Sequence, residues 1–338
     1  MNTTVSKSGT LPLLAPKTAL ALSPHALHLL AAVLLLAPFF LGDYGLHLAI
    51  SGGIMSLGAM ALTVLCGTAG LPSLGTAAFL GIGGFSAGIL ASKLGLSLLP
   101  AMATGAAIGA LLGLLVALLT IRVSGLYLAV GTLALQHIVS IVATDIDIRM
   151  TFASGFLLDA PQVLGIAIDS PVRWWLLTLV LMTLLFSLLS YLLGGAVGRE
   201  WNLLREQPTA AGTLGISATR SRAGVFALSS AVIAATGAVD AYYIGNVQAG
   251  AYTIHVAVAY LTVIVLGGAG RLAGAVIAAY VVILLPVTLT ALLRWLGVDA
   301  SRVAGIENIV LGLILIFSLV RGRQHILHWL TLRKTTHD

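Results

Sequence analysis

The sequence predicts an all-α protein that crosses a membrane about ten times, with both termini in the cytoplasm. Of its 338 residues, 59% are hydrophobic and only 8% are charged, whereas soluble domains carry roughly 25% charged residues. The hydrophobic residues gather in runs close to the ~20 residues that an α-helix needs to span the bilayer core. Lysines and arginines gather between alternate runs, which is the charge bias of cytoplasmic loops.

We expect the ten spans near residues 26–42, 45–66, 76–92, 98–120, 125–144, 172–195, 223–244, 255–267, 273–293 and 305–320. They form one transmembrane domain over residues 26–320, between a cytoplasmic segment at 1–25 and a basic cytoplasmic tail at 321–338. The first run resembles a signal peptide, but no convincing small-residue cleavage site follows it, so we interpret it as a retained span. The main external loop is expected at about 145–171, and the main cytoplasmic loop at about 196–222.

Basic residues set the orientation, because they favour the cytoplasmic side of short loops. With the N-terminus inside, the ten spans place twelve of the 17 lysines and arginines inside and five outside. The inside set is Lys7, Lys17, Arg122, Arg199, Arg205, Arg220, Arg222, Arg271, Arg321, Arg323, Arg333 and Lys334. The outside set is Lys93, Arg149, Arg173, Arg294 and Arg302, and acids such as Asp145 and Asp147 also fall outside.

Several classes of function lack support in the sequence. The net charge of +6 would suggest nucleic acid in a soluble protein, but here the basic residues flank membrane spans, so we expect no nucleic-acid partner. The eight histidines are scattered and form no metal site, and Cys66 is the only cysteine. Gly84-Phe85-Ser86-Ala87-Gly88 matches the serine-hydrolase pattern, but inside an apolar span it is a chance match. No phosphate-binding Gly-x-x-x-x-Gly-Lys-Ser/Thr is present, so any ATP hydrolysis must occur in another chain.

A polar segment at residues 198–222 carries six charged residues between two apolar spans. Within it, Pro208 suits the first turn of a helix and Gly215 suits a left-handed stop. The short helix between them would place Ala210, Ala211 and Leu214 on one flat face, which could pack against another protein. The alternative is a solvated loop whose arginines only fix the orientation.

Glycines have two expected roles. Two glycine-rich breaks, at residues 67–75 and 267–274, interrupt the chain on the cytoplasmic side. Broken helices of this kind either pack closely or expose backbone groups to a substrate path, since irregular backbone is tolerated where it lines a cavity. The glycines assigned to helix packing or to breaks are Gly84, Gly88, Gly105, Gly109, Gly113, Gly267, Gly268, Gly270 and Gly274.

Few polar residues interrupt the spans. Asp240 near the outer end of the seventh span is the most informative, because a buried charge in a bilayer is costly and is usually paired. The alternative is that it reaches the outer interface. Gln136, His137 and His47 also fall within spans, where an interhelical hydrogen bond is a more common role than a ligand contact.

Four blocks in order resemble one family, the permeases of bacterial branched-chain amino acid ABC transporters, particularly the longer of the two paired permeases. The blocks are residues 67–85 (GTAGLPSLGTAAFLGIGGF), residues 122–135 (RVSGLYLAVGTLAL), the polar segment at 198–222, and residues 265–275 (VLGGAGRLAGA). The resemblance covers about residues 46–320. It implies an integral permease that works in the bilayer beside a second permease, two ATPase subunits and an external solute-binding protein.

The resemblance also implies residue roles. The loop that docks on the ATPase and transmits its closure comprises Arg205, Glu206, Pro208, Ala210, Ala211, Gly212, Leu214 and Gly215. The substrate path or gate is expected among Gly70, Ser73, Gly75, Thr76, Phe85, Tyr127, Thr132, Gln136 and Asp240. No cofactor is expected in this chain, because ATP and Mg²⁺ would be used by the ATPase subunits.

Departures from the family pattern leave the substrate open. Thr76 and Phe85 stand where the family commonly has histidine and tyrosine, and residues 151–155 replace a Thr-Gly-Gly-like turn. Branched-chain or other hydrophobic amino acids are the leading substrates, and urea, short amides or another small polar solute are the alternative. An autonomous secondary transporter is a lower-ranked reading, with Asp240 as its one candidate for an ion relay.

Overall fold

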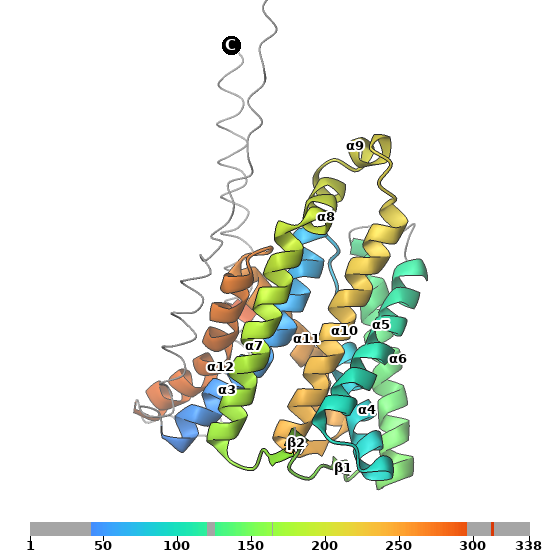
Figure 1. Cartoon of the computed structure of the whole chain (residues 1–338). Helices are drawn as coiled ribbons and strands as arrows, with labels where there is room; N and C mark the ends of the chain where they lie inside the picture. Colours follow the sequence, from blue (N-terminus) through green and yellow to red (C-terminus); the bar gives the residue numbers. More distant parts are fainter. Residues whose placement is uncertain (1–41, 120–125, 164, 296–311, 314–338) are drawn as a thin grey trace, which may run out of the picture.

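The computed structural model describes residues 42–119, 126–163, 165–295 and 312–313. In this part of the chain, eight helices are long and apolar enough to cross a membrane, and they form one bundle (Figure 1). The prediction of an all-α, polytopic membrane protein is confirmed. The expected spans at 26–42 and 305–320 lie outside the described residues, apart from residues 42, 312 and 313, as do the expected N-terminal segment and basic tail.

The long helices follow the apolar runs because, in lipid, every backbone polar group must be hydrogen-bonded within the protein. The first half contains α3 (Asp43–Thr63), the π-helical turn η1 (Val64–Thr68), α4 (Thr76–Leu94), α5 (Leu98–Leu119), α6 (Leu126–Thr151), β1 (Phe156–Leu157), β2 (Gln162–Val163) and β3 (Ile166–Ala167). The second half contains α7 (Pro171–Gly194), α8 (Ala196–Glu206), α9 (Pro208–Thr213), α10 (Ala218–Ile244), β4 (Asn246–Val247), the short η2 (Ala249–Ala251), α11 (Ile254–Gly267) and α12 (Leu272–Trp295).

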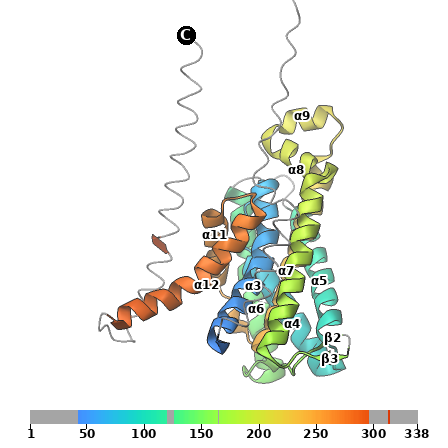
Figure 2. The same ribbon diagram turned by 60° about the vertical axis from the view of Figure 1, so that its left-hand side comes forward.

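Helices α3 and α10 form the centre of the bundle. α10 packs against α5, α4 and α3, and α3 also packs against α12, α7 and α11. Figures 1 and 2 show α8 and α9 at one end of this bundle and the short strands at the other. Under the predicted orientation, the end with α8 and α9 faces the cytoplasm, and the strands face outward.

Small residues let α5 approach α10 closely. Gly105 lies against Ser86 and Gly83 of α4, while Gly109 and Gly113 lie against Ser230 and its neighbours on α10. A Cβ at Gly109 would stand 2.8 Å from the Ser230 carbonyl oxygen, nearer than real Cβ contacts allow. Such close packing replaces the hydrophobic drive that lipid does not provide.

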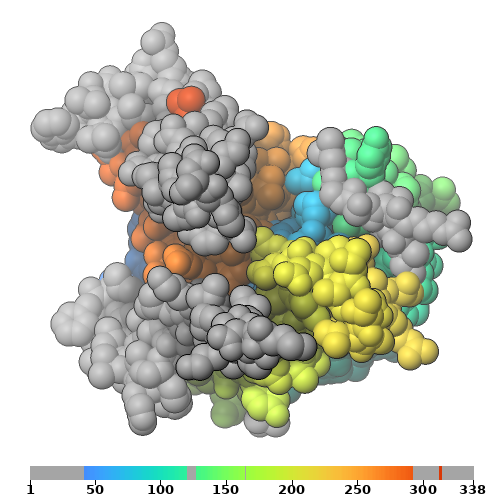
Figure 3. Space-filling view, turned by 90° about the horizontal axis from the view of Figure 1, so that it is seen from above, coloured from blue at the N-terminus to red at the C-terminus, as the bar shows by residue number. Residues whose placement is uncertain are grey.

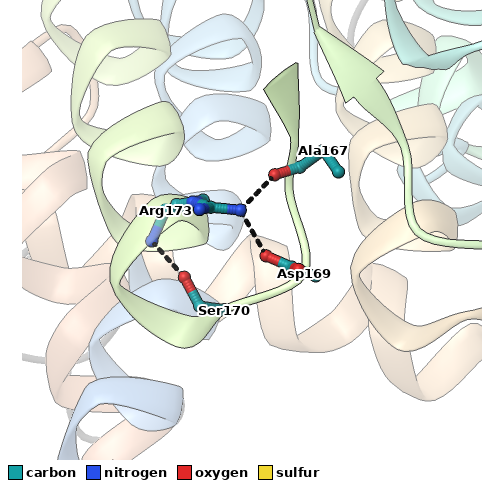
Figure 4. Close-up of polar contacts among 4 residues, drawn as sticks. All are labelled: Ala167, Asp169, Ser170 and Arg173. Atoms are coloured by element: carbon teal, nitrogen blue, oxygen red, sulfur yellow. Dashed lines mark hydrogen bonds and ion pairs between the residues drawn. The ribbon is translucent and has the colours of Figure 1, made fainter. Parts of the chain in front are cut away.

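Helix α7 begins at a local polar cap, which Figure 4 shows in detail. The Ser170 hydroxyl accepts a hydrogen bond from the Arg173 backbone N–H at 3.4 Å, and Pro171 occupies the first turn. The Arg173 guanidinium donates to the Ala167 carbonyl at 2.8 Å and to the Asp169 carboxylate at 2.6 Å. The cap ends the strand-containing segment and directs the chain back into the bundle.

Two helix boundaries differ by five or more residues from the sequence prediction, and one helix was not predicted. α6 continues to Thr151 rather than 144, because Asp145 and Arg149, one turn apart, form an ion pair at 2.7 Å that carries the helix past the apolar run. The external connection is correspondingly shorter than the expected 145–171. α10 begins at Ala218 rather than 223, since the Ser217 hydroxyl caps it by accepting from the Arg220 N–H. The cytoplasmic segment also contains α8, which the sequence analysis left out.

The external connection adds strands that the all-α prediction did not include. β1 pairs antiparallel with β4, with Phe156 opposite Val247, and β2 pairs with β3 as a hairpin. These pairs are two residues long, so they fasten loops rather than form a separate layer.

Replacing Gly109 with alanine should destabilise the bundle by about 1–3 kcal/mol, because the new methyl group meets α10 backbone. Gly224→Ala is the matched control, because Gly224 also lies in a helix but has open space around it, and alanine there should be neutral or stabilising. Thermal unfolding in detergent measures both. A Gly109→Ala protein with the same Tm as Gly224→Ala would contradict the close packing.

Candidate functional site

The polar segment forms a helical hairpin at one end of the bundle. α8 is amphipathic and buries Trp201 and Leu204, while α9 stands beyond it as an exposed turn (Figures 1 and 3). Pro208 occupies the first turn of α9, and Gly215 has φ of +78°, in the left-handed region. This geometry is the one that the proline and the glycine favour.

The expected flat face on α9 does not form. Ala211 is fully buried and accepts a backbone hydrogen bond from Ile216, whereas Leu214 is 70% exposed. The prediction that Ala210, Ala211 and Leu214 share one face is wrong because α9 ends at Thr213, so helical spacing no longer applies to Leu214. The exposed residues available to a partner are instead Arg205, Glu206, Gln207, Pro208, Thr209, Gly212, Thr213, Leu214 and Gly215.

Arg205 connects this hairpin to the first glycine break. Its guanidinium donates a hydrogen bond to the carbonyl of Gly67 in η1. Its aliphatic stem passes over Gly70, where a Cβ would stand 2.9 Å from the Arg205 Cγ. Gly70 has φ of +68°, so glycine suits this position for both its backbone conformation and the space that it leaves.

The two glycine breaks lie against each other and are called here the glycine joint (residues 67–75 and 267–274). Gly67 faces the backbone of Ala269 and Gly270, and Gly267 faces the backbone of Gly274. Gly268 and Gly270 have φ of +83° and +90°. The breaks that the sequence placed 200 residues apart therefore form one unit at the α8 and α9 end.

Part of the expected substrate path gathers beside this joint. The Leu74 N–H donates to the Thr132 hydroxyl at 2.9 Å, and the Gly75 N–H donates to the Ser73 hydroxyl at 3.3 Å. Thr76 is buried, and its hydroxyl has no hydrogen-bond partner in the described structure. Tyr127 does not join them, because it is 78% exposed on the outer surface of the bundle.

Phe85, Gly84 and Gln136 converge on a residue that the sequence analysis missed, Tyr252. The Tyr252 ring lies against Gly84, and its centroid is 6.2 Å from that of Phe85. The Gln136 Nε2 donates to the Tyr252 carbonyl at 2.9 Å, while the buried Gln136 Oε1 has no partner among the described residues. Gly88, one turn after Gly84, packs against Phe156 of β1.

Asp240 is partly buried among aromatic residues. Its carboxylate lies within electrostatic range of the phenols of Tyr243, Tyr252 and Tyr260. Tyr243 in turn hydrogen-bonds His47 of α3, with Nδ1 and the hydroxyl 2.7 Å apart. The polar neighbours of Asp240 therefore come from α10, α11 and the turn between these helices. Ser73 and Thr132 belong to the other set of polar residues, at the first glycine break.

The opposite end is held by a second residue that the sequence analysis did not single out, Asp147. This carboxylate is 5% exposed and accepts hydrogen bonds from the Thr151 hydroxyl at 2.5 Å, the Gly155 N–H at 3.2 Å and the Ala249 N–H at 3.0 Å. With the β1–β4 pairing, these bonds fasten residues 147–158 to residues 245–251, and this unit is called the clasp.

The described residues contain no cluster of three or more His, Cys, Asp or Glu side chains that could hold a metal ion. These residues instead provide an exposed hairpin, the glycine joint beside it, buried polar groups along the bundle and the clasp at the far end.

Asp147→Asn should loosen the clasp, because an amide nitrogen cannot accept and leaves at least one backbone N–H unpaired, at a cost of about 1–3 kcal/mol. Hydrogen–deuterium exchange should rise in residues 153–157 and 246–251. The control, Asp145→Asn, removes only an exposed ion pair, worth about 0–1 kcal/mol. Unchanged exchange in Asp147→Asn would contradict the fastening role.

Comparison with known proteins identifies relatives of the whole bundle. Residues 45–319 match the family described as branched-chain amino acid transport system, permease component. Two relatives, from Salmonella typhimurium and Escherichia coli, are each described as the high-affinity branched-chain amino acid transport system permease protein LivM. Each is 26% identical over 282 aligned residues, which cover 75% of this chain and 66% of the relative. No solved structure matches the chain.

The family match includes all eight membrane helices of the described structure, both glycine breaks and the α8–α9 hairpin. The aligned part spans just under two thirds of the length of the two relatives. With its apolar helices and this match, the chain is a multi-pass protein of the bacterial inner membrane. It belongs to the family of permease components of branched-chain amino acid transport systems.

Proposed function

We propose that this chain is the membrane-spanning permease subunit of an ATP-driven ABC importer for branched-chain or other hydrophobic amino acids. The family match and the names of the two relatives support the transport role and the substrate class. Transport requires no covalent chemistry in this chain, so its contribution is a path and the helix movements that open it to each side in turn.

The observation that carries the proposal is the link between the exposed α8–α9 hairpin and the glycine joint. An ATPase subunit docks on the exposed residues between Glu206 and Gly215, and Leu214 supplies an apolar contact there. Movement of the hairpin then reaches the bundle where two chain breaks meet, at Gly67 and Gly270. A self-sufficient transporter has no need of such a docking hairpin.

The remaining parts of the importer follow from the same proposal. A second permease packs beside this one, and two ATPase subunits bind ATP and Mg²⁺ on the cytoplasmic side. An external solute-binding protein delivers the substrate near the clasp. The substrate crosses between the paired permeases, and the buried polar groups around Thr132 and Gln136 are candidate contacts along the way.

The proposal is tested by mild-detergent affinity purification of this chain from its native membrane, with mass spectrometry of the proteins that co-purify. Recovery of a second permease and ATPase subunits supports the importer. The purified complex in liposomes should then accumulate radiolabelled leucine only with ATP and binding protein. Accumulation of urea or a short amide instead of leucine would assign the transporter to the alternative substrate class. Uptake by this chain alone, without ATP, would overturn the proposal in favour of a secondary transporter.

Gly215 offers a specific prediction about docking. Its φ of +78° and the open space around it mean that a substitution is limited by backbone strain rather than by a clash. Gly215→Val should distort the end of α9 and reduce co-purification of the ATPase, because a β-branched residue is strongly disfavoured in the left-handed region. Asn tolerates that region, so Gly215→Asn is the matched control and should retain the ATPase. Equal ATPase recovery with valine and asparagine would argue against this role.

A further inference from the structure

The side chain of Arg205 extends from the α8–α9 hairpin and contacts a part of the chain 138 residues away. It lies in the last turn of α8, and its guanidinium donates to the Gly67 carbonyl. The guanidinium of the other arginine of α8, Arg199, donates to the carbonyl of Gly194, five residues before it, at 3.2 Å. The two arginines of this helix therefore make different contacts: Arg199 bonds a neighbouring residue, and Arg205 joins two segments that are distant in the sequence.

The Gly67 carbonyl is well suited to this bond. It lies in η1, the π-helical turn that ends the α3 helix, and the last carbonyls of a helix lack partners within it. A cation at this end also interacts favourably with the helix dipole. The Ala69 N–H donates to the Val64 carbonyl and the Leu71 N–H to the Leu65 carbonyl, so the widened turn leads directly into the break. Arg205 thus caps a helix that belongs to a different part of the bundle.

The contacts continue beyond Gly67. Its other face lies against the backbone of Gly270 in the turn between α11 and α12, and the Arg205 stem rests on Gly70. Arg205, Gly67 and Gly270 therefore form a continuous stack from α8 through η1 to the α11–α12 turn. A displaced guanidinium would act on both halves of the glycine joint at once.

We propose that Arg205 is the positioning residue that transmits displacement of the α8–α9 hairpin to the glycine joint. The inference rests on the proposed function, since it assumes that an ATPase moves the hairpin. The Arg205 guanidinium is bonded to the Gly67 carbonyl, although the residue as a whole is exposed, whereas the 70% exposed Leu214 side chain is the apolar contact that we assign to the ATPase. π-turns occur often at functional sites, and Gly268 and Gly270 of the joint adopt left-handed conformations that favour glycine.

The test uses the complete transporter in liposomes, with Arg205→Gln, Arg205→Lys and, as the matched control on the same helix, Arg199→Gln. Three quantities are measured for each: ATPase recovered on purification, ATP hydrolysed, and leucine accumulated per ATP. Arg205→Gln should keep ATPase recovery near the wild-type level but lower leucine per ATP by about tenfold, the effect of losing one charge-assisted hydrogen bond. Lysine keeps the charge but not the planar donor fork, so Arg205→Lys should fall between glutamine and wild type.

Arg199→Gln should behave as wild type. If Arg205→Gln does not reach the membrane, the Arg205→Lys result decides, because this variant retains the cation. Wild-type leucine per ATP in the Arg205 variants would overturn the transmission role, and so would loss of the ATPase subunits on purification, which would make Arg205 a docking contact. Failure of the proposed function can be distinguished from failure of this inference, since in that case the wild-type chain itself would recover no ATPase or show no ATP-dependent uptake.

Discussion

The structure depends on direct contact between main chains at glycines. Gly83 of α4 lies against the Ala234 carbonyl of α10, and Gly237 of α10 lies against the Leu80 main chain. Lipid tails are as apolar as the helices, so burial alone does not drive association, and packing at small residues takes its place. The same kind of contact joins Gly67 to Gly270. One physical rule therefore accounts both for the rigid centre of the bundle and for its joint.

Different contacts hold the two ends of the bundle. At the α8–α9 end, the two glycine breaks lie backbone to backbone, and Arg205 connects the hairpin to them. At the other end, Asp147 and the β1–β4 pairing hold the connections of α6 and α10 together. Under the proposed function, helix groups would rock between these two ends, as alternating access requires.

The polar groups between these ends form two neighbourhoods rather than one path. Thr132 and Ser73 lie beside the joint, where they bond backbone groups of the first break. Gln136, Phe85 and Asp240 gather around Tyr252, towards the clasp. A solute that crosses beside this chain would meet them in sequence. Thr76 and Phe85, the two departures from the expected family pattern, fall one in each neighbourhood.

The sequence predicted the spans well because hydrophobicity and length are local properties. The eight expected spans within the described residues correspond to eight helices, and Pro208 and Gly215 fixed the limits of α9. Interactions across the chain could not be predicted. Asp147 reaches Ala249, 102 residues away, and Arg205 reaches Gly67, 138 residues away. The burial of Ala211 could not be predicted either, because it depends on how α9 packs against the rest of the chain.

The central claim is that the hairpin and the glycine joint move as one body when ATP binds. Electron cryomicroscopy of the assembled transporter, without nucleotide and trapped with ATP, tests it most directly. The account predicts that α8 and α9 shift together with residues 67–70 and 267–271, and that the Arg205–Gly67 contact is kept in both states. A hairpin that moves while both breaks of the joint stay fixed against α3 and α12 would contradict it.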